Sequence, residues 1–280
     1  MRETQLGFLE FVRLGSEHHV VTKNRLKALY IRLAGYPGIL PKISQGHAIN
    51  AALAVPLQAG AKVLDAGCGM GFLSLCLARR LPQIHVLGID ASEEKTSNCN
   101  TIARALGMSN VQFRAGQLED ILDQARFDLI CCVDVLEHIE EDEKVLSNFR
   151  RVLKDDGRLI VVVPRPARDQ LQFLRIYKQF PLHVTEDATR HVRDEYSFEE
   201  ISAKLTAAGF SICSHRYAFG RAGRLAFELS ILGWNRAKFW SKAGLLTYPV
   251  AVVLAYLDLV LRKTRGNSMI LIAVPAESHA

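Results

Sequence analysis

The chain has 280 residues and a formal net charge of +6 at pH 7. Its length suits one large α/β core with additions, and no linker rich in Pro, Ser or Gly divides it into two domains. The charge is uneven: residues 1–60 hold seven basic and three acidic residues, residues 220–265 hold eight and two, and the remainder holds 20 and 24. A basic core would indicate a nucleic-acid partner, so this distribution argues against one.

Residues 1–60 and 220–265 combine positive charge with apolar and aromatic residues. This combination is typical of segments that contact an anionic membrane surface, although ordinary solvated helix faces would give the same composition. The amino-terminal sequence lacks an apolar run before a small-residue cleavage site, so we expect a cytoplasmic protein. The six cysteines show no Cys-x-x-Cys pair and no companion histidines at metal-binding spacing, which predicts reduced thiols and no metal site.

Helical periodicity dominates the first 60 residues. Apolar side chains recur every three or four positions over residues 6–34, which predicts one helix that ends before Pro37 and Pro41. A second helix is predicted over residues 44–58. The region also contains side chains able either to line a substrate pocket or to occupy surface and capping positions: His18, His19, Tyr36 and His47.

Residues 63–72 read Val-Leu-Asp-Ala-Gly-Cys-Gly-Met-Gly-Phe, which predicts a buried strand, a glycine turn and the start of an apolar helix. Free N-H groups at such a helix start can approach a ligand. A dinucleotide would place its pyrophosphate here, but the carboxylate of Asp65 would repel it and would attract an ammonium group. Asp90 ends the next apolar run, where a ribose-binding acid belongs. The two acids favour an adenosine joined to an amino acid.

Further apolar runs predict strands at residues 111–115, 127–132, within 153–164, and at 210–217 and 269–274. Helices are predicted between them, at residues 71–81, after the N-cap candidate Ser92, at 140–153, and after the N-cap candidate Ser197, which forms a capping box with Glu200. The last two strands are separated by some fifty residues that include an uncharged run at 243–257.

The glycine turn, Asp90 and two later blocks resemble the class I S-adenosylmethionine-dependent methyltransferases, in particular the small-molecule group that includes the ubiquinone and menaquinone biosynthesis methyltransferases. The later blocks are residues 127–139, which contain Val-Asp-Val-Leu-Glu-His-Ile, and residues 153–164. The likeness covers residues 61–163 in detail and extends more loosely to residue 274. It implies S-adenosylmethionine as the methyl donor and S-adenosylhomocysteine as the product.

The resemblance also implies the fold. We expect an α/β fold: a Rossmann-like, mostly parallel seven-stranded sheet with helices on both faces and the last strand antiparallel. Residues 61–219 and 266–280 form this catalytic domain, and residues 1–60 form an N-terminal helical lid. Residues 164–193 are expected to be an acceptor-site insertion, and residues 220–265 a helical insertion before the last strand.

By resemblance, the donor-binding residues follow the strand ends. The methionine part is expected at the glycine turn and after the fourth strand, the ribose at the second strand, and the adenine at the third. Gln117 stands where the family commonly has an aspartate, and its side-chain carbonyl can still accept a hydrogen bond from the adenine amino group. The expected set is Asp65, Gly67, Cys68, Gly69, Gly71, Asp90, Ala91, Gln117, Leu118, Cys132, Val133 and Asp134.

The donor methyl group is already activated, so a general base is needed only if the acceptor must lose a proton. His138 lies one helical turn after Asp134 and either reaches the acceptor pocket or forms part of a turn. His191 lies in a stretch that resembles the family's His-x-Arg-x-x-Tyr motif, with Arg193 and Tyr196. Capping explains Ser197 but leaves these three side chains free for the substrate. His191 and His138 are therefore the catalytic candidates.

The uncharged run at residues 243–257 would be about 22 Å long as a helix, which is shorter than the roughly 30 Å hydrocarbon core of a bilayer, and Pro249 interrupts it. Its flanking strands must also return to the same sheet. The run is therefore predicted to lie in a membrane interface or dip into it, or else to form a helical pair over the acceptor site or against a second subunit.

The sequence thus predicts methylation of a small lipophilic acceptor at oxygen, carbon or nitrogen, at the cytoplasmic face of a membrane contacted through residues 230–262. No nucleic-acid partner is expected, and a homodimer is one alternative for the apolar surface. Two other hypotheses stay open: an RNA or protein methyltransferase, and a non-catalytic subunit that binds S-adenosylmethionine.

Overall fold

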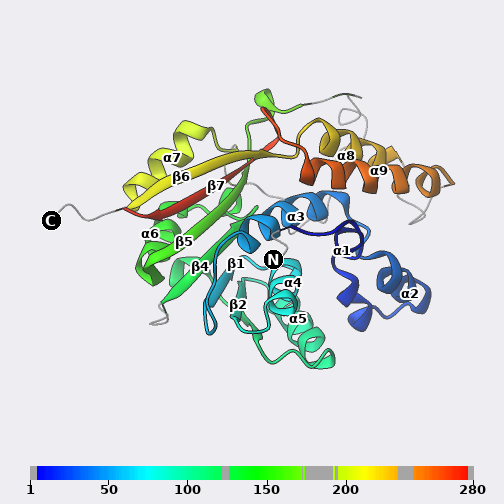
Figure 1. Ribbon diagram of the computed structural model, residues 1–280, viewed down its shortest axis with the longest axis horizontal. Helices are drawn as coiled ribbons and strands as arrows, with labels where there is room; N and C mark the ends of the chain where they lie inside the picture. Colours follow the sequence, from blue (N-terminus) through cyan, green and yellow to red (C-terminus); the bar gives the residue numbers. More distant parts are fainter. Residues whose placement is uncertain are drawn as a thin grey trace.

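The computed structural model describes residues 5–121, 126–171, 173, 192, 195–232 and 242–276. Its centre is a seven-stranded sheet in the order β3-β2-β1-β4-β5-β7-β6 (Figure 1). β7 is antiparallel to both of its neighbours, and the other described pairings are parallel, which confirms the predicted fold class. The strands are β1 (Lys62–Ala66), β2 (His85–Asp90), β3 (Val111–Ala115), β4 (Phe127–Val133), β5 (Leu153–Pro164), β6 (Phe210–Ala218) and β7 (Ser268–Pro275).

Helices cover both faces of the sheet because its central strands are apolar on both sides. Successive side chains of a strand point to opposite faces, so Val63 of β1 joins one core and Leu64 joins the other. The first core is covered by α3 (Ile39–Leu53), α4 (Phe72–Arg80) and α5 (Glu93–Ala105), and the second by α6 (Asp142–Val152) and α7 (Phe198–Ala207). Five of the cysteines are buried, and all six are free thiols.

The predicted single helix over residues 6–34 is wrong. The structure has three short helices here: α1 (Phe8–Val12), the 3-10 helix η1 (Ser16–Val21) and α2 (Arg25–Ala34). Gly15 interrupts the helical conformation with a φ of +76°, and a Cβ at this position would lie 2.5 Å from the Phe72 ring. Asn24 then starts α2 by accepting a hydrogen bond from the Lys27 N-H group. Periodicity alone could not reveal these breaks, because the close packing of Gly15 is a long-range contact.

Helix α3 begins at Ile39 and ends at Leu53, so the predicted span of 44–58 is also wrong. Pro41 lies in the first turn of α3, where a missing N-H group costs nothing. The next residue, Lys42, is fully buried and donates hydrogen bonds to the carbonyl groups of Phe11, Val12 and Leu14. Lys42 thereby caps the end of α1 and fastens it to α3.

The described part of the helical insertion consists of α8 (Arg221–Leu232) and α9 (Lys242–Val260). α9 packs against α8, α3 and α1, so the insertion and the N-terminal helices form one layer, as Figure 1 shows. The predicted interruption at Pro249 is wrong, because α9 continues through this residue. Among the helices that the structure describes, none combines the length and the apolar character needed to cross a bilayer.

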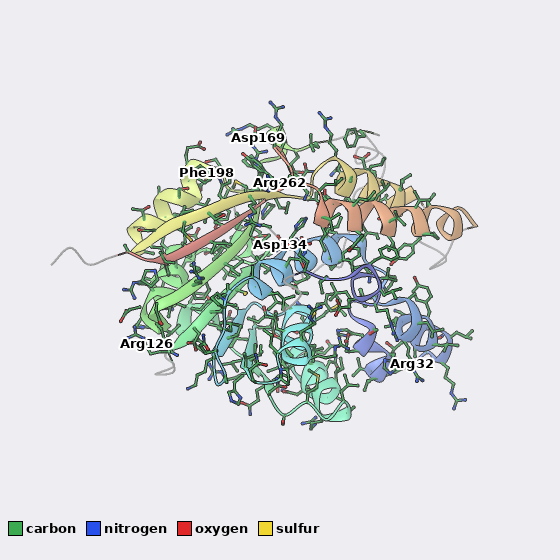
Figure 2. All side chains as sticks on the ribbon, viewed as in Figure 1. Arg32, Arg126, Asp134, Asp169, Phe198 and Arg262 are labelled. Carbon is green, nitrogen blue, oxygen red and sulfur yellow. The ribbon has the colours of Figure 1, made fainter. Side chains whose placement is uncertain are left out.

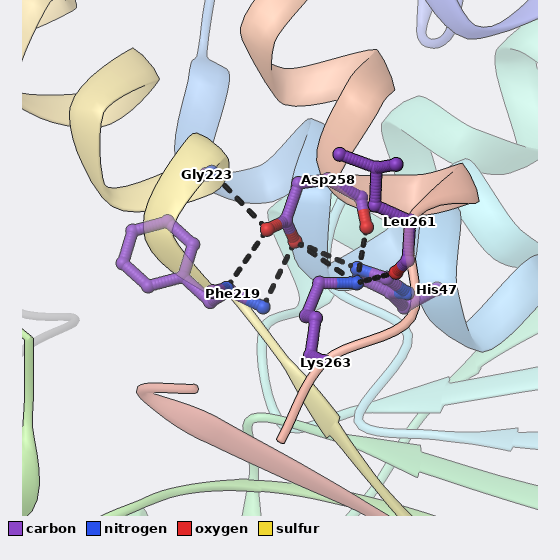
Figure 3. A network of polar contacts seen from close by, with 7 residues as sticks. His47, Phe219, Gly223, Asp258, Leu261 and Lys263 are labelled. Carbon is purple, nitrogen blue, oxygen red and sulfur yellow. Dashed lines mark hydrogen bonds and ion pairs between the residues drawn. The ribbon is translucent and has the colours of Figure 1, made fainter. Parts of the chain in front are cut away.

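A buried carboxylate joins α8 to α9. Asp258 of α9 is 1% exposed and accepts hydrogen bonds from the N-H groups of Phe219, Gly220 and Gly223 at 3.1, 2.8 and 3.1 Å (Figure 3). These groups lie just before α8 and in its first turn, where backbone N-H groups otherwise lack partners. Asp258 therefore acts as the N-terminal cap of a helix that precedes it by some forty residues.

The same carboxylate also contacts the imidazole ring of His47 and the ammonium group of Lys263. His47 of α3 places its Nε2 atom 3.0 Å from the Oδ2 atom of Asp258, and the Nζ atom of Lys263 lies 3.6 Å from Oδ2. Burial alone would raise the pKa of Asp258, but the hydrogen bond to His47 and the charge of Lys263 lower it below its ordinary value. The network thus links α3, α8 and α9 around one ionised group.

We predict that Asp258→Ala will lower the free energy of unfolding by about 3–5 kcal/mol, because it removes the carboxylate partner of the buried Lys263 ammonium and the cap of α8. Urea denaturation measures the loss. The matched control is Asp155→Ala, since Asp155 is an 82% exposed carboxylate in a surface ion pair with Arg126. Equal unfolding midpoints for the two variants would show that the network contributes nothing to stability.

Candidate functional site

The three glycines after β1 have different surroundings. Gly67 and Gly71 have φ angles of +76° and +72°, and a Cβ on them would lie 2.3 Å from Val135 and 2.9 Å from Phe113. These two glycines are therefore required by the packing of the protein itself. Gly69 has a φ of +51°, but a Cβ there would meet no atom within 4 Å. The loop is thus packed at its two ends and open at Gly69, which is the space that a ligand could occupy.

Hydrogen bonds fix the loop to the end of β2. The N-H groups of Gly67 and Cys68 donate to the carbonyl group of Ile89 at 2.8 and 2.9 Å. The N-H group of Gly69 donates to the Oδ2 atom of Asp90 at 2.8 Å, and Ser92 donates to Oδ1 at 2.9 Å. Asp90 therefore holds both the loop and the start of α5. Because its side chain keeps 13% of its surface exposed, it can also meet a ligand.

Asp65 lies at the end of β1 and is only 3% exposed. The hydroxyl group of Ser74 in α4 donates to its Oδ2 atom at 2.6 Å. The pKa of Asp65 is raised to about 6, mainly by burial. The charge of Asp90 adds to this rise, and the hydrogen bonds from Ser74 oppose it. Asp65 thus fixes the first turn of α4 and adds negative charge close to the loop, from a position largely closed to solvent.

Asp134 follows the end of β4 in a left-handed conformation with a φ of +52°. Such backbone strain in a residue other than glycine is characteristic of functional sites. Its N-H group donates to the carbonyl group of Val162 at 2.9 Å, and its carboxyl group is hydrogen-bonded to Ser44 of α3. Burial raises the pKa of Asp134 to about 6. Figure 2 shows this residue beside α3, near the middle of the molecule.

Glu137 was not among the predicted site residues. It lies in the 3-10 helix η3 (Leu136–His138), is 2% exposed, and its Oε2 atom has no hydrogen-bond partner among the described residues. Burial, followed by the charge of Asp134, raises the pKa of Glu137 well above its usual value. The spacing Asp-x-x-Glu directly after a strand was the available signal for this pair of acids.

The remaining donor-site candidates also lie at strand ends. Gln117 and Leu118 follow β3, next to the N-H group of Gly116, which donates to the Asp90 carbonyl group at 3.0 Å. Gln117 is exposed, whereas Leu118 is buried at the start of the 3-10 helix η2 (Leu118–Asp120). Strands β3, β2, β1 and β4 are neighbours in the sheet. Their carboxyl ends therefore bring together the predicted set: Asp65, Gly67, Cys68, Gly69, Gly71, Asp90, Ala91, Gln117, Leu118, Cys132, Val133 and Asp134.

The structure describes one of the two catalytic candidates, His138. His138 ends η3 and is half-buried, close in sequence to Asp134 and Glu137. His191 lies outside the described residues, as do Arg193 and most of the predicted acceptor-site insertion, of which the 3-10 helix η4 (Ala167–Asp169) is described. The expectation that Tyr196 is free for a substrate is wrong, because its buried hydroxyl group is bonded to Asp142 at 2.6 Å.

The N-terminal layer reaches the loop through His18. The Nε2 atom of His18 lies 2.8 Å from the carbonyl oxygen of Met70, the residue between Gly69 and Gly71. Burial lowers the pKa of His18, so the neutral ring donates this bond. Its ring also packs against those of Tyr36 and Phe72. Of the other two candidates, His19 bonds to the Ser16 carbonyl group and His47 to Asp258.

Comparison with known proteins gives a consistent assignment. A methyltransferase domain family matches residues 57–209, more than half of the chain. The ubiquinone biosynthesis O-methyltransferase of Xylella fastidiosa (strain 9a5c) is 31% identical over 163 residues, which cover 56% of this chain and 63% of the relative. The corresponding protein of Hahella chejuensis is 28% identical over 162 residues, which cover 56% and 66%. The chain therefore spans just under two thirds of the length of these relatives.

Solved structures share the fold. A putative sarcosine dimethylglycine methyltransferase from Galdieria sulphuraria aligns with a TM-score of 0.58 at 17% identity, covering 88% of both chains. An S-adenosylmethionine-dependent methyltransferase from Clostridium acetobutylicum aligns with a TM-score of 0.52 at 15% identity, covering 90% of this chain and 98% of that chain. From the matched family and from the strand order of its sheet, the chain belongs to the methyltransferase domain family and has the class I fold of S-adenosylmethionine-dependent enzymes.

Proposed function

We propose that this protein transfers a methyl group from S-adenosylmethionine to a small, lipophilic acceptor and releases S-adenosylhomocysteine. The observation that carries the proposal is the glycine loop, which is open at Gly69 and lies between the carboxyl groups of Asp65 and Asp90. Negative charge at Asp90 beside the loop and at Asp65 beneath it suits a ligand with ammonium and sulfonium groups and disfavours a pyrophosphate.

Each part of the donor has candidate partners at the strand ends. Asp90 and Ala91 would hold the ribose, and the exposed amide of Gln117, beside Leu118, would accept a hydrogen bond from the adenine amino group. The loop glycines and Cys68 would surround the methionine part. Beyond them, Cys132, Val133 and Asp134 would line its other side at the end of β4. The buried carboxyl of Asp65 would support this arrangement from beneath the loop.

The bound donor supplies a methyl group that is already activated for nucleophilic attack. The protein therefore has mainly to orient the acceptor and exclude water. An acceptor hydroxyl group must also lose its proton, and we propose His138 and His191 as the groups that take it. Burial raises the pKa of the nearby carboxyls of Asp134 and Glu137, so both would take up a proton more readily than exposed acids. Their protonation would reduce the negative charge of this pocket.

The acceptor class follows from two further observations. The curated relatives are named ubiquinone biosynthesis O-methyltransferases, which favours a lipophilic, quinone-related acceptor and methylation at oxygen. α9 also exposes apolar side chains, with Val250 52% and Val253 46% exposed. These support contact with the inner face of a membrane through residues 230–262, whereas association with a second copy is the competing explanation for the same surface.

Asp90 provides a test of the donor site. Asp90→Ala should weaken S-adenosylmethionine binding by roughly 10- to 100-fold, because it removes a charged acceptor of hydrogen bonds from both ligand and loop. Isothermal titration calorimetry measures the affinity, with Asp155→Ala as the control. Unchanged affinity in Asp90→Ala, or tighter binding of a nicotinamide dinucleotide to the parent protein, would refute the proposed donor.

A related prediction separates packing from ligand contact within the loop. Gly67→Ala should lower the melting temperature, because its methyl group would collide with Val135. Gly69→Ala should cost only about 1–2 kcal/mol, the strain of a left-handed alanine, yet weaken donor binding at least about tenfold. Thermal melts and calorimetry on both variants test this. Full donor affinity in Gly69→Ala would place the ligand elsewhere.

Another prediction addresses the reaction. Purified protein with S-adenosylmethionine should form S-adenosylhomocysteine when it is supplied with a lipid extract and not with the aqueous metabolites of the same cells. Mass spectrometry of the extract identifies the methylated product and the methylated atom. Product formed from the aqueous fraction alone would contradict the lipophilic acceptor, and methylated RNA or protein would assign the enzyme to another substrate class.

A further inference from the structure

Helix α2 exposes the side that a soluble helix normally buries. Leu26, Leu29 and Leu33 are 80%, 53% and 64% exposed. At about 100° per residue, these three leucines fall within an arc of about 60° on the helix. Ile31, which is 1% exposed, lies on the opposite side and packs into the protein. α2 therefore carries a continuous leucine stripe that faces solvent, rather than single exposed apolar residues.

Two basic residues lie beside the leucine stripe. Arg25 and Arg32 lie about 70–90° to one side of its centre, whereas Lys27, about 130° from the centre, lies nearer the buried Ile31. All three are exposed, and Figure 2 shows Arg32 at the outer edge of α2. Lys23 precedes the helix, and residues 23–34 contain no Asp or Glu. An apolar stripe bordered by cationic side chains is the pattern of a helix that lies in an anionic lipid interface.

α2 is fixed in this orientation by its neighbours. Tyr30 is half-buried close to Tyr248 of α9, and Ile31 anchors the buried face. The Asn24 cap starts the helix, and Gly35 ends it with a φ of +76°. In Figure 1, α2 and the first turns of α9 lie at the same end of the molecule. The leucine stripe is thus held rigidly on the outside of the N-terminal layer.

We propose that α2 is a membrane-docking helix that inserts its leucine stripe into the interface of an anionic bilayer, with Arg25 and Arg32 at the level of the lipid phosphates. This goes beyond the proposed function, because binding of α2 to a bilayer requires no methyl transfer. In addition, α2 lies outside residues 230–262. It also gives the lid a role. Docking would bring the layer that contacts the glycine loop through His18 to the surface from which a lipophilic acceptor enters.

Charge favours a bilayer over a second copy of the chain. A two-fold interface formed by α2 would set the same patch against itself, so Arg25 and Arg32 would face the same two residues of the second copy, and residues 23–34 supply no acid between them. An anionic bilayer instead buries the leucines among its acyl chains and places the cations beside its lipid phosphates. Each basic residue near such a surface contributes about 1 kcal/mol to binding, which is about fivefold in affinity.

Sedimentation with vesicles tests the proposal on the full chain. The parent protein should bind phosphatidylcholine vesicles that contain phosphatidylglycerol and bind pure phosphatidylcholine vesicles weakly. The triple variant Leu26→Ser, Leu29→Ser, Leu33→Ser should lose at least about tenfold in vesicle affinity. The variant Arg25→Gln, Arg32→Gln should lose much of the dependence on phosphatidylglycerol and on salt.

Matched controls come from the last turn of α5 and from its C-cap residue, Leu106. Leu106→Ser replaces a 41% exposed leucine, and Arg104→Gln replaces an exposed arginine, so both should bind vesicles as the parent does. Melting temperature and S-adenosylmethionine affinity, measured in every variant, show whether the fold and the donor site are intact.

Three results would overturn the inference. The first is full vesicle binding by the folded triple leucine variant. The second is loss of binding in Val250→Ser, Val253→Ser with no loss in the triple leucine variant, which would assign the contact to α9 and leave the proposed function intact. The third is a dimer of the parent protein, seen by sedimentation velocity, that the triple leucine variant abolishes. Absence of methyl transfer with vesicle binding preserved would refute the proposed function alone.

Discussion

The site depends on one carboxylate at the end of β2. Asp90 accepts hydrogen bonds from Gly69 in the glycine loop and from Ser92 at the start of α5, so a single side chain sets the distance between two elements of the sheet edge. The other hydrogen bonds from the loop to β2 that the described residues make go to the Ile89 carbonyl group. A ligand that binds over Gly69 therefore meets a surface whose shape is already established, which reduces the entropy lost on binding.

Negative charge at this edge is concentrated and partly buried. Asp65, Asp134 and Glu137 all have raised pKa values, because burial disfavours their ionised forms. Burying several acids close together costs stability unless a cation compensates them. A donor that carries positive charge would provide this compensation. The same arrangement would make the loop a poor site for a phosphate, although its glycines and its helix start resemble those of phosphate-binding loops.

Helix α3 connects the site to the rest of the molecule. Lys42 holds the end of α1, Ser44 contacts the carboxyl group of Asp134, and His47 joins the Asp258 network that organises α8 and α9. Three neighbouring positions on one helix therefore link the lid, the site and the helical insertion. A displacement of α3 would change the contacts of the lid, the site and the helical insertion together. The N-terminal layer is therefore connected through α3 to the candidate acceptor side of the sheet.

The sequence by itself determined the sheet and its ligand edge. The local signals are the apolar runs that became β1 to β7, the three glycines, and the acids Asp65 and Asp90. The carboxyl ends of parallel strands necessarily lie along the same edge of a sheet. Only the tertiary structure decided what each remaining side chain does. The break at Gly15, the burial of Tyr196 and Glu137, and the outward direction of the leucines on α2 all depend on residues distant in the chain. Periodicity shows that a helix has an apolar side, but the partner that covers that side, or leaves it open, is chosen by packing between elements.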